Sequence, residues 1–180
     1  MGLWAAPALA TSVLLIATGS AKALHPNTAA VGLPLIRTQR RATTTNRVVG
    51  VIEVVVGLAG VVIGSRLIDA VTAALFVGFG VVSLVGVRSQ APTCGCVGKT
   101  DTPPTMAHVA MSAIFAGVAA VAAAVGDRSS LLAVASRHST AIDIGLIVSS
   151  LAVSWLAWTV LSLGRLHPRP EGRVTGRPAT

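Results

Sequence analysis

The chain has 180 residues, of which 53% are hydrophobic and 11% are charged, and its mean hydropathy is +0.77. A soluble domain of this size carries about 25% charged residues, so this composition excludes an ordinary soluble globular protein. The net charge of +8 would indicate a nucleic-acid partner in a soluble protein. Here the basic residues lie between apolar segments, where they act as topology signals, and we expect no nucleic-acid partner.

Apolar segments of membrane-spanning length recur along the chain. A spanning helix needs roughly 20 apolar residues, because a rise of about 1.5 Å per residue must cover about 30 Å of hydrocarbon. Five segments meet or approach this length, at residues 3–21, 48–64, 67–87, 105–126 and 141–164. The predicted fold class is all-α, a polytopic membrane helix bundle of four core spans plus a fifth. Residues 1–164 form the multi-pass membrane domain, and residues 165–180 are predicted to be a basic disordered tail.

The first segment allows two interpretations. Ala21-Lys22-Ala23 resembles the small-residue cleavage site of a signal peptide, but the segment lacks a positively charged start, which favours a retained span. The polar, basic stretch 22–47 that follows contains two prolines and predicts a connecting loop, with room for a short interfacial helix within it.

The later connections differ in length. The second and third segments are joined by the short turn Ser65-Arg66-Leu67, which predicts a tight antiparallel hairpin. Thr105 is the expected N-cap of the fourth span. Small residues at helical spacing, Gly60 with Gly64 and more weakly Ala74 with Gly78, predict close helix–helix packing within the bundle.

The chain's two cysteines lie in the loop before the fourth span, in the stretch APTCGCVGKTD that begins at Ala91. The letters GKT within it do not form a phosphate-binding loop. That motif requires a glycine at position 93, where this chain has Thr93, and it requires a preceding strand instead of a membrane span.

Cys94 and Cys96 are too few for a disulfide framework and, even with His108, too few for a closed zinc site, so no metal and no cofactor is expected. A disulfide between them would close a very small, strained and easily reduced ring, which the backbone freedom of Gly95 permits. The start of the fourth span and Lys99 would stabilise a thiolate. A redox pair and a static or inert pair both fit this pattern.

Ionisable residues inside the spans are candidates for function. Glu53 lies six residues beyond Arg47, about 9 Å along a helix, and Lys22 at the end of the first span is its expected partner. The pair is predicted to be structural or proton-handling, on the membrane face of the cysteine loop. His108 on that face is a candidate proton acceptor. Asp69 and Asp143 are expected to reach the interface at the starts of their spans.

Taken in this order, these motifs resemble the methylamine-utilisation protein MauE family, which is related to DoxX-like four-helix membrane proteins. Val97 stands where that family usually has Phe. The resemblance covers roughly residues 10–160. It is carried by GSAKALHP from Gly19, GVIEVVVGL from Gly50, CGCVGK from Cys94 and AHVAMSAIF from Ala107.

The resemblance implies a multi-pass protein of the plasma or inner membrane that assists maturation or disulfide redox of exported proteins. In the family this role is maturation of methylamine dehydrogenase, whose small subunit is rich in disulfides. Cys94 and Cys96 would act as a thiol–disulfide oxidoreductase pair. The implied partners are membrane lipid and a thioredoxin-like redox protein or an exported client. The alternatives are a non-catalytic membrane assembly scaffold and a small-solute transporter, the latter resting on Glu53 and the number of spans.

The orientation of the cysteine loop is predicted differently by charge and by function. The positive-inside rule places the loop in the cytoplasm, whereas disulfide chemistry on exported proteins requires it outside. We expect the outward orientation, on the ground that part of the charge of residues 22–47 lies on an interfacial segment. On the loop side the basic residues are Lys22, Arg37, Arg40, Arg41, Arg47, Arg88, Lys99, Arg165, Arg169, Arg173 and Arg177, against Arg66, Arg128 and Arg137 on the other.

Overall fold

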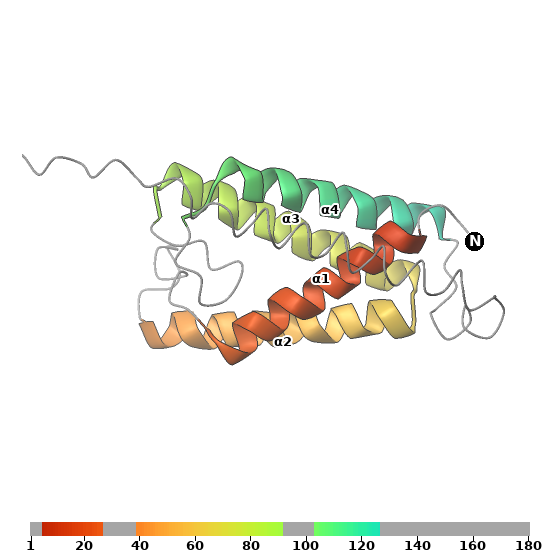
Figure 1. Cartoon of the computed structure of the whole chain (residues 1–180), viewed down its shortest axis with the longest axis horizontal. Coiled ribbons are helices and arrows are strands. Elements are labelled where there is room, and N and C mark those ends of the chain that lie inside the picture. The colour runs from red at the N-terminus through yellow and green to blue at the C-terminus, as the bar shows by residue number, and fades with distance from the viewer. Residues whose placement is uncertain (1–4, 27–38, 92–102, 127–180) are drawn as a thin grey trace, which may run out of the picture.

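The computed structural model describes residues 5–26, 39–91 and 103–126, and these ranges are entirely helical apart from their turns. They form four helices: α1 (Ala5–Leu24), α2 (Gln39–Val62), α3 (Arg66–Arg88) and α4 (Met106–Val125). All four are long and apolar enough to cross a membrane, which confirms the all-helical prediction for the four core spans (Figure 1). The predicted fifth span at 141–164 and the tail at 165–180 lie outside the described residues.

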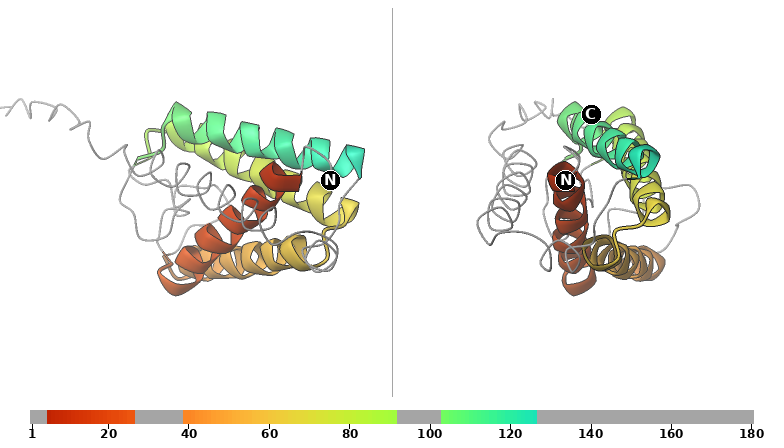
Figure 2. Two further views of the ribbon diagram at one scale, coloured as in Figure 1. Left: turned by 45° about the vertical axis from the view of Figure 1, so that its right-hand side comes forward. Right: turned by 90° about the vertical axis from the view of Figure 1, so that its right-hand side faces the viewer.

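The four helices pack as two antiparallel hairpins. α1 packs obliquely across α2 and α3 lies along α4, while α1 also contacts α4 and α2 contacts α3 (Figures 1 and 2). One end of the bundle, here called the loop end, carries the C-termini of α1 and α3 and the N-termini of α2 and α4. The described flanks of the cysteine loop, Ala91 and Pro103, therefore lie at the loop end.

The second span begins nine residues earlier than the sequence predicted. α2 starts at Gln39 instead of residue 48, so Arg40, Arg41 and Arg47 lie on the helix and not in a loop. The predicted span begins where polarity changes, but a helix can extend beyond its apolar part. The first residues of α2, Gln39 to Ala42, are good helix formers, whereas the three threonines and Asn46 that follow are not, so propensity alone does not set this boundary. The basic side chains therefore adjoin the span directly. The outward orientation rests on assigning part of the charge of residues 22–47 to an interfacial segment separate from the span. That reason does not apply to these three arginines, and the outward orientation stays a prediction.

The turn between α2 and α3 is as short as the sequence predicted. Gly64 adopts a left-handed conformation with φ of 57°, and the Ser65 hydroxyl caps α3 by accepting from the Ile68 N–H at 3.3 Å. The predicted close packing is confirmed at Gly60, where a Cβ would collide with the Ser12 side chain of α1, but Gly64 lies beyond the end of α2 and so forms no helical motif with it. Ala74 and Gly78 are exposed, and a Cβ on Gly78 would meet nothing within 4 Å, so this pair does not pack inside the bundle.

The distribution of polarity differs from that in a soluble protein. Polar side chains are buried among the described residues, and large apolar side chains cover the outside of α2, α3 and α4. The buried Thr11 hydroxyl donates to the Ala8 carbonyl at 2.7 Å, so its helix satisfies it without water. This is the arrangement expected of a bundle surrounded by lipid. The buried polar residues are Thr11, Ser12, Thr18, Lys22, Glu53, Asp69, Thr72, Ser83 and His108.

Asp69 differs from its prediction. Its side chain is 2% exposed and lies among the buried face of α3, so it does not simply extend to the membrane interface. The reason is the tightness of the turn, because Asp69 follows the N-cap Ser65 by one helical turn and faces the same side as the buried Thr72 and Phe76.

Candidate functional site: a buried ion pair and the flanks of the cysteine loop

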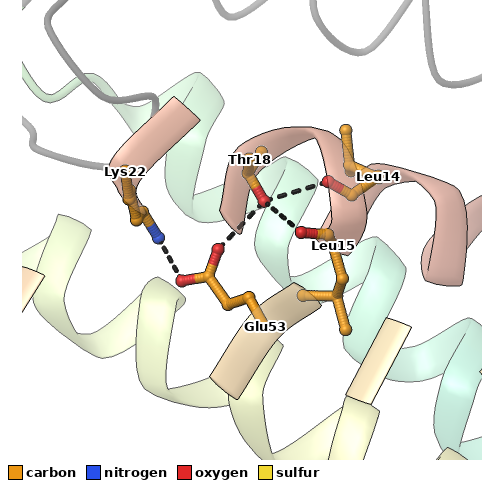
Figure 3. Close-up of polar contacts among 5 residues, drawn as sticks. All are labelled: Leu14, Leu15, Thr18, Lys22 and Glu53. Atoms are coloured by element: carbon orange, nitrogen blue, oxygen red, sulfur yellow. Dashed lines mark hydrogen bonds and ion pairs between the residues drawn. The ribbon is translucent and has the colours of Figure 1, made fainter. Parts of the chain in front are cut away.

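The structure brings together the two charged residues that the sequence predicted to pair. The Lys22 ammonium on α1 lies 2.5 Å from Glu53 Oε1 on α2, with side-chain exposures of 5% and 0% (Figure 3). Removing two charges from water is costly, and their attraction offsets this cost only when geometry and further hydrogen bonds are good. The pair therefore fixes the position of α1 relative to α2.

A threonine completes the coordination of the carboxylate. The Thr18 hydroxyl, one turn before Lys22 on α1, donates toward Glu53 Oε2 at 3.1 Å and also lies 2.9 Å from the Leu14 carbonyl oxygen (Figure 3). Both carboxylate oxygens thus have a partner. The sequence reasoning missed Thr18, although its spacing of four residues from Lys22 places both on one face of a helix.

The third partner of the pair comes from the other hairpin. The Lys22 ammonium lies 4.2 Å from the centre of the Phe79 ring on α3, within the range of a cation–π interaction. Phe79 also makes an edge-to-face contact with Phe76, which packs on Phe115 of α4. The ion pair is thereby connected to the apolar core between the hairpins. No local sequence signal pointed to Phe79, since its role depends on how the hairpins pack.

Two glycines allow α1 and α2 to approach at the level of the pair. Gly19 and Gly50 each precede a charged residue by three positions and face one another. A Cβ on Gly50 would lie 2.7 Å from the Gly19 carbonyl oxygen and 2.9 Å from the Ala23 nitrogen. Any larger residue would separate the helices and therefore the charges. The matching spacings GxxK and GxxE are a signal that could have identified both glycines.

The pair lies inside the bundle instead of at its end. Phe79, which contacts Lys22, precedes Arg88 at the end of α3 by nine residues, about 14 Å along the helix. Glu53 likewise follows Gln39, the first residue of α2, by 14 residues, so the pair lies near mid-depth of the bundle, well below the loop flanks, and not on the membrane face predicted for it. His108 has no contact with Lys22 or Glu53 among the interactions of the described residues.

His108 has a defined local role at the start of α4. Its Nδ1 accepts from the Thr105 backbone N–H at 3.2 Å and lies 2.8 Å from the Thr105 hydroxyl, forming a capping box. Because an amide N–H can only donate, Nδ1 is unprotonated in this arrangement and a neutral ring carries its proton on Nε2. Protonation at Nδ1 would remove this cap. Thr105 is the N-cap that the sequence predicted.

The flanks of the cysteine loop are fixed to the bundle on both sides. α3 ends in a Schellman motif, in which Ala91 N–H donates to the Gly86 carbonyl and Gln90 N–H to the Val87 carbonyl. Gly86 is also in tight contact with Pro104, since a Cβ there would lie 2.9 Å from Pro104 Cγ. Cys94 and Cys96 themselves lie outside the described residues. Within the described ranges no three His, Cys, Asp or Glu side chains gather as metal ligands.

Comparison with known proteins gives one result. A family model described as Methylamine utilisation protein MauE matches residues 2–126, which include all four helices and the cysteine loop. The search of the curated proteins and the search of the solved structures returned no match.

Proposed function

Since the chain belongs to the methylamine utilisation protein MauE family, we propose that this multi-pass membrane protein assists the maturation or disulfide redox of exported proteins through its Cys-Gly-Cys loop. The observation that carries the proposal is the attachment of this loop's flanks to two rigid helix ends. The Schellman motif at Ala91 and the Gly86–Pro104 contact hold the two ends of a short segment that contains both thiols.

The proposed chemistry is thiol–disulfide exchange. A thiolate of a client dithiol attacks the Cys94–Cys96 disulfide, forming a mixed disulfide, and the second client thiolate then releases the loop as a dithiol. The client loses two electrons and two protons, and the loop gains them. A thioredoxin-like protein in its disulfide form reoxidises the loop by the reverse exchange. The positive end of the α4 dipole at the loop's C-terminal flank supports the thiolate form.

The buried Lys22–Glu53 pair has a structural role in this proposal. Both oxygens of Glu53 have partners, and Lys22 is enclosed by the carboxylate and the Phe79 ring. These contacts support a role in fixing α1 on α2 more than a role in moving protons. His108 likewise serves the α4 cap, which in turn positions the loop flank at Thr105.

The experiment that tests the proposal replaces Cys94 and Cys96 singly with Ser and measures disulfide formation in an exported client. Thr93→Ser is the matched control, because it is an equally small change in the same loop. We expect both cysteine variants to lose activity and the control to keep it. Full activity in both cysteine variants would leave the non-catalytic assembly scaffold as the function.

Orientation is tested on the same loop with a membrane-impermeant thiol reagent after reduction. The chain has no other cysteines, so labelling reports this loop alone. Labelling in intact cells is expected if the clients are exported proteins. Labelling only in inverted vesicles would contradict the exported clients and restrict the exchange to cytoplasmic thiols.

A further inference from the structure

Four exposed arginines gather at the loop end of the bundle. We call them the arginine collar: Arg40, Arg41 and Arg47 on α2 and Arg88 at the end of α3. The carboxylates of the described residues do not balance them. Glu53 is paired with Lys22 inside the bundle, and Asp69 lies in the first turn of α3, at the opposite end.

Two residues of the collar, Arg40 and Arg47, continue the exposed apolar face of α2. The exposed valines Val48, Val51 and Val55 follow Arg40, Thr44 and Arg47 at spacings of three and four residues, so all lie on one face of the helix. That face carries no packed partner among the described helices, since its valines are about half exposed. A lipid lying along the valines would therefore have its headgroup beside the arginines.

The level of the collar matches a headgroup layer. Arg66 and Arg88 bracket α3 and lie 22 residues apart, about 33 Å, close to the roughly 30 Å of a bilayer's hydrocarbon. α2 has nearly the same length and ends at the turn where α3 begins, so Arg40 and Arg41 lie near the level of Arg88. Figure 1 shows these two helix ends at the same end of the bundle.

Arg47 lies deeper and still reaches this layer. It follows Arg40 by seven residues, about 10 Å along the helix. Side chains on a helix lean toward its N-terminus, which for α2 is the loop end, so the long Arg47 side chain extends back toward the headgroups. All four guanidinium groups are then available to phosphate oxygens, for which their forked donors are suited.

We infer that the arginine collar binds the headgroups of anionic phospholipids at the loop end. The bound lipid would fix the depth of α2 and, through it, the level of the loop flanks. This inference is independent of the thiol chemistry proposed above, since it uses none of the cysteines.

The test titrates the purified full-length chain with phosphatidylglycerol or phosphatidylcholine and counts retained lipids by native mass spectrometry. A variant with all four collar arginines changed to Gln is compared with one in which Arg165, Arg169, Arg173 and Arg177 are changed to Gln, which removes the same charge elsewhere. Wild-type protein is expected to prefer phosphatidylglycerol. The preference should fall by about fivefold per collar arginine removed and stay unchanged in the tail variant.

Three results would overturn the inference. These are an unchanged preference in the collar variant, an equal loss in the tail variant, and displacement of the lipid by millimolar inorganic phosphate, which would assign the site to a free anion. Should the fourfold variant fail to fold, single Arg40→Gln and Arg47→Gln variants keep the test intact. Each is expected to lower the preference several-fold, and no change in either would equally contradict the inference.

Discussion

Different kinds of interaction hold the two helices together in each hairpin of the bundle. Between α1 and α2, glycines bring the backbones into contact and a single buried ion pair, Lys22–Glu53, fixes their position. Between α3 and α4, the contact is spread over the aromatic rings of Phe76 and Phe115 and the apolar side chains around them, which include Leu75 of α3 and Met111 of α4. In lipid, burial of apolar surface does not drive helices together, so association depends on close packing and polar contacts.

This difference predicts different sensitivities to substitution. An interface organised by one ion pair and two facing glycines depends on a few atoms at fixed positions. An interface of distributed apolar packing tolerates change at any one position better. The four predictions below run from the largest expected effect to the smallest, and the first three test this contrast directly.

Removing one partner of the ion pair should have the largest effect. Glu53→Ala leaves the Lys22 ammonium buried without its carboxylate, and we expect a loss of about 3–5 kcal/mol in the free energy of unfolding. Unfolding in mixed micelles with increasing denaturing detergent measures this loss. The combined Lys22→Met and Glu53→Leu variant should recover most of the stability, because it contains no buried charge.

The exchange Lys22→Glu with Glu53→Lys distinguishes a pair from two separate charge requirements. It should be more stable than the worse of its two single variants, since a pair of opposite charges is restored. A double variant no better than that single variant would show that the two residues act independently.

Gly50→Ala should have the second-largest effect, a loss of stability, whereas Gly78→Ala should increase stability. At Gly50 the new methyl would press on the backbone of α1, and overpacking of this kind costs about 1–3 kcal/mol. Gly78 lies in open space on α3, so Ala there should stabilise by about 0.5–1 kcal/mol through helix propensity alone. Both positions are helical, so the difference between them isolates the α1–α2 contact. Equal values by the same unfolding assay would refute close packing at Gly50.

The capping box of α4 should show the smallest effect. Thr105→Ala should cost about 1 kcal/mol as the loss of an N-cap, whereas His108→Gln should stay within about 0.5 kcal/mol. Gln at this position of a capping box can accept from the same backbone N–H. Thermal unfolding followed by circular dichroism measures both. A His108→Gln variant that folds normally but no longer supports client disulfide formation would instead assign His108 to proton transfer.

The bundle's outline could be predicted from the sequence because hydropathy is a local property. Four spans, the tight turn at Ser65 and the Thr105 cap follow from residues that are neighbours in the chain. The start of α2 could not be placed this way, since Arg40 to Arg47 are polar and helical at once. Glu53 and Lys22 could be matched because buried opposite charges in two neighbouring spans require one another.

The remaining parts of the site were decided by the tertiary structure. Which face of α1 meets α2 determines that Gly19 and Gly50 touch, that Thr18 reaches Glu53, and that Gly78 does not pack at all. Phe79 covers Lys22 only because the second hairpin lies against the first. The sequence alone determined that this protein is a helical membrane bundle with a paired lysine and glutamate, because burial in lipid leaves few other solutions. Helix rotation and crossing depend on contacts between segments distant in the chain, so only the tertiary structure decided what surrounds that pair.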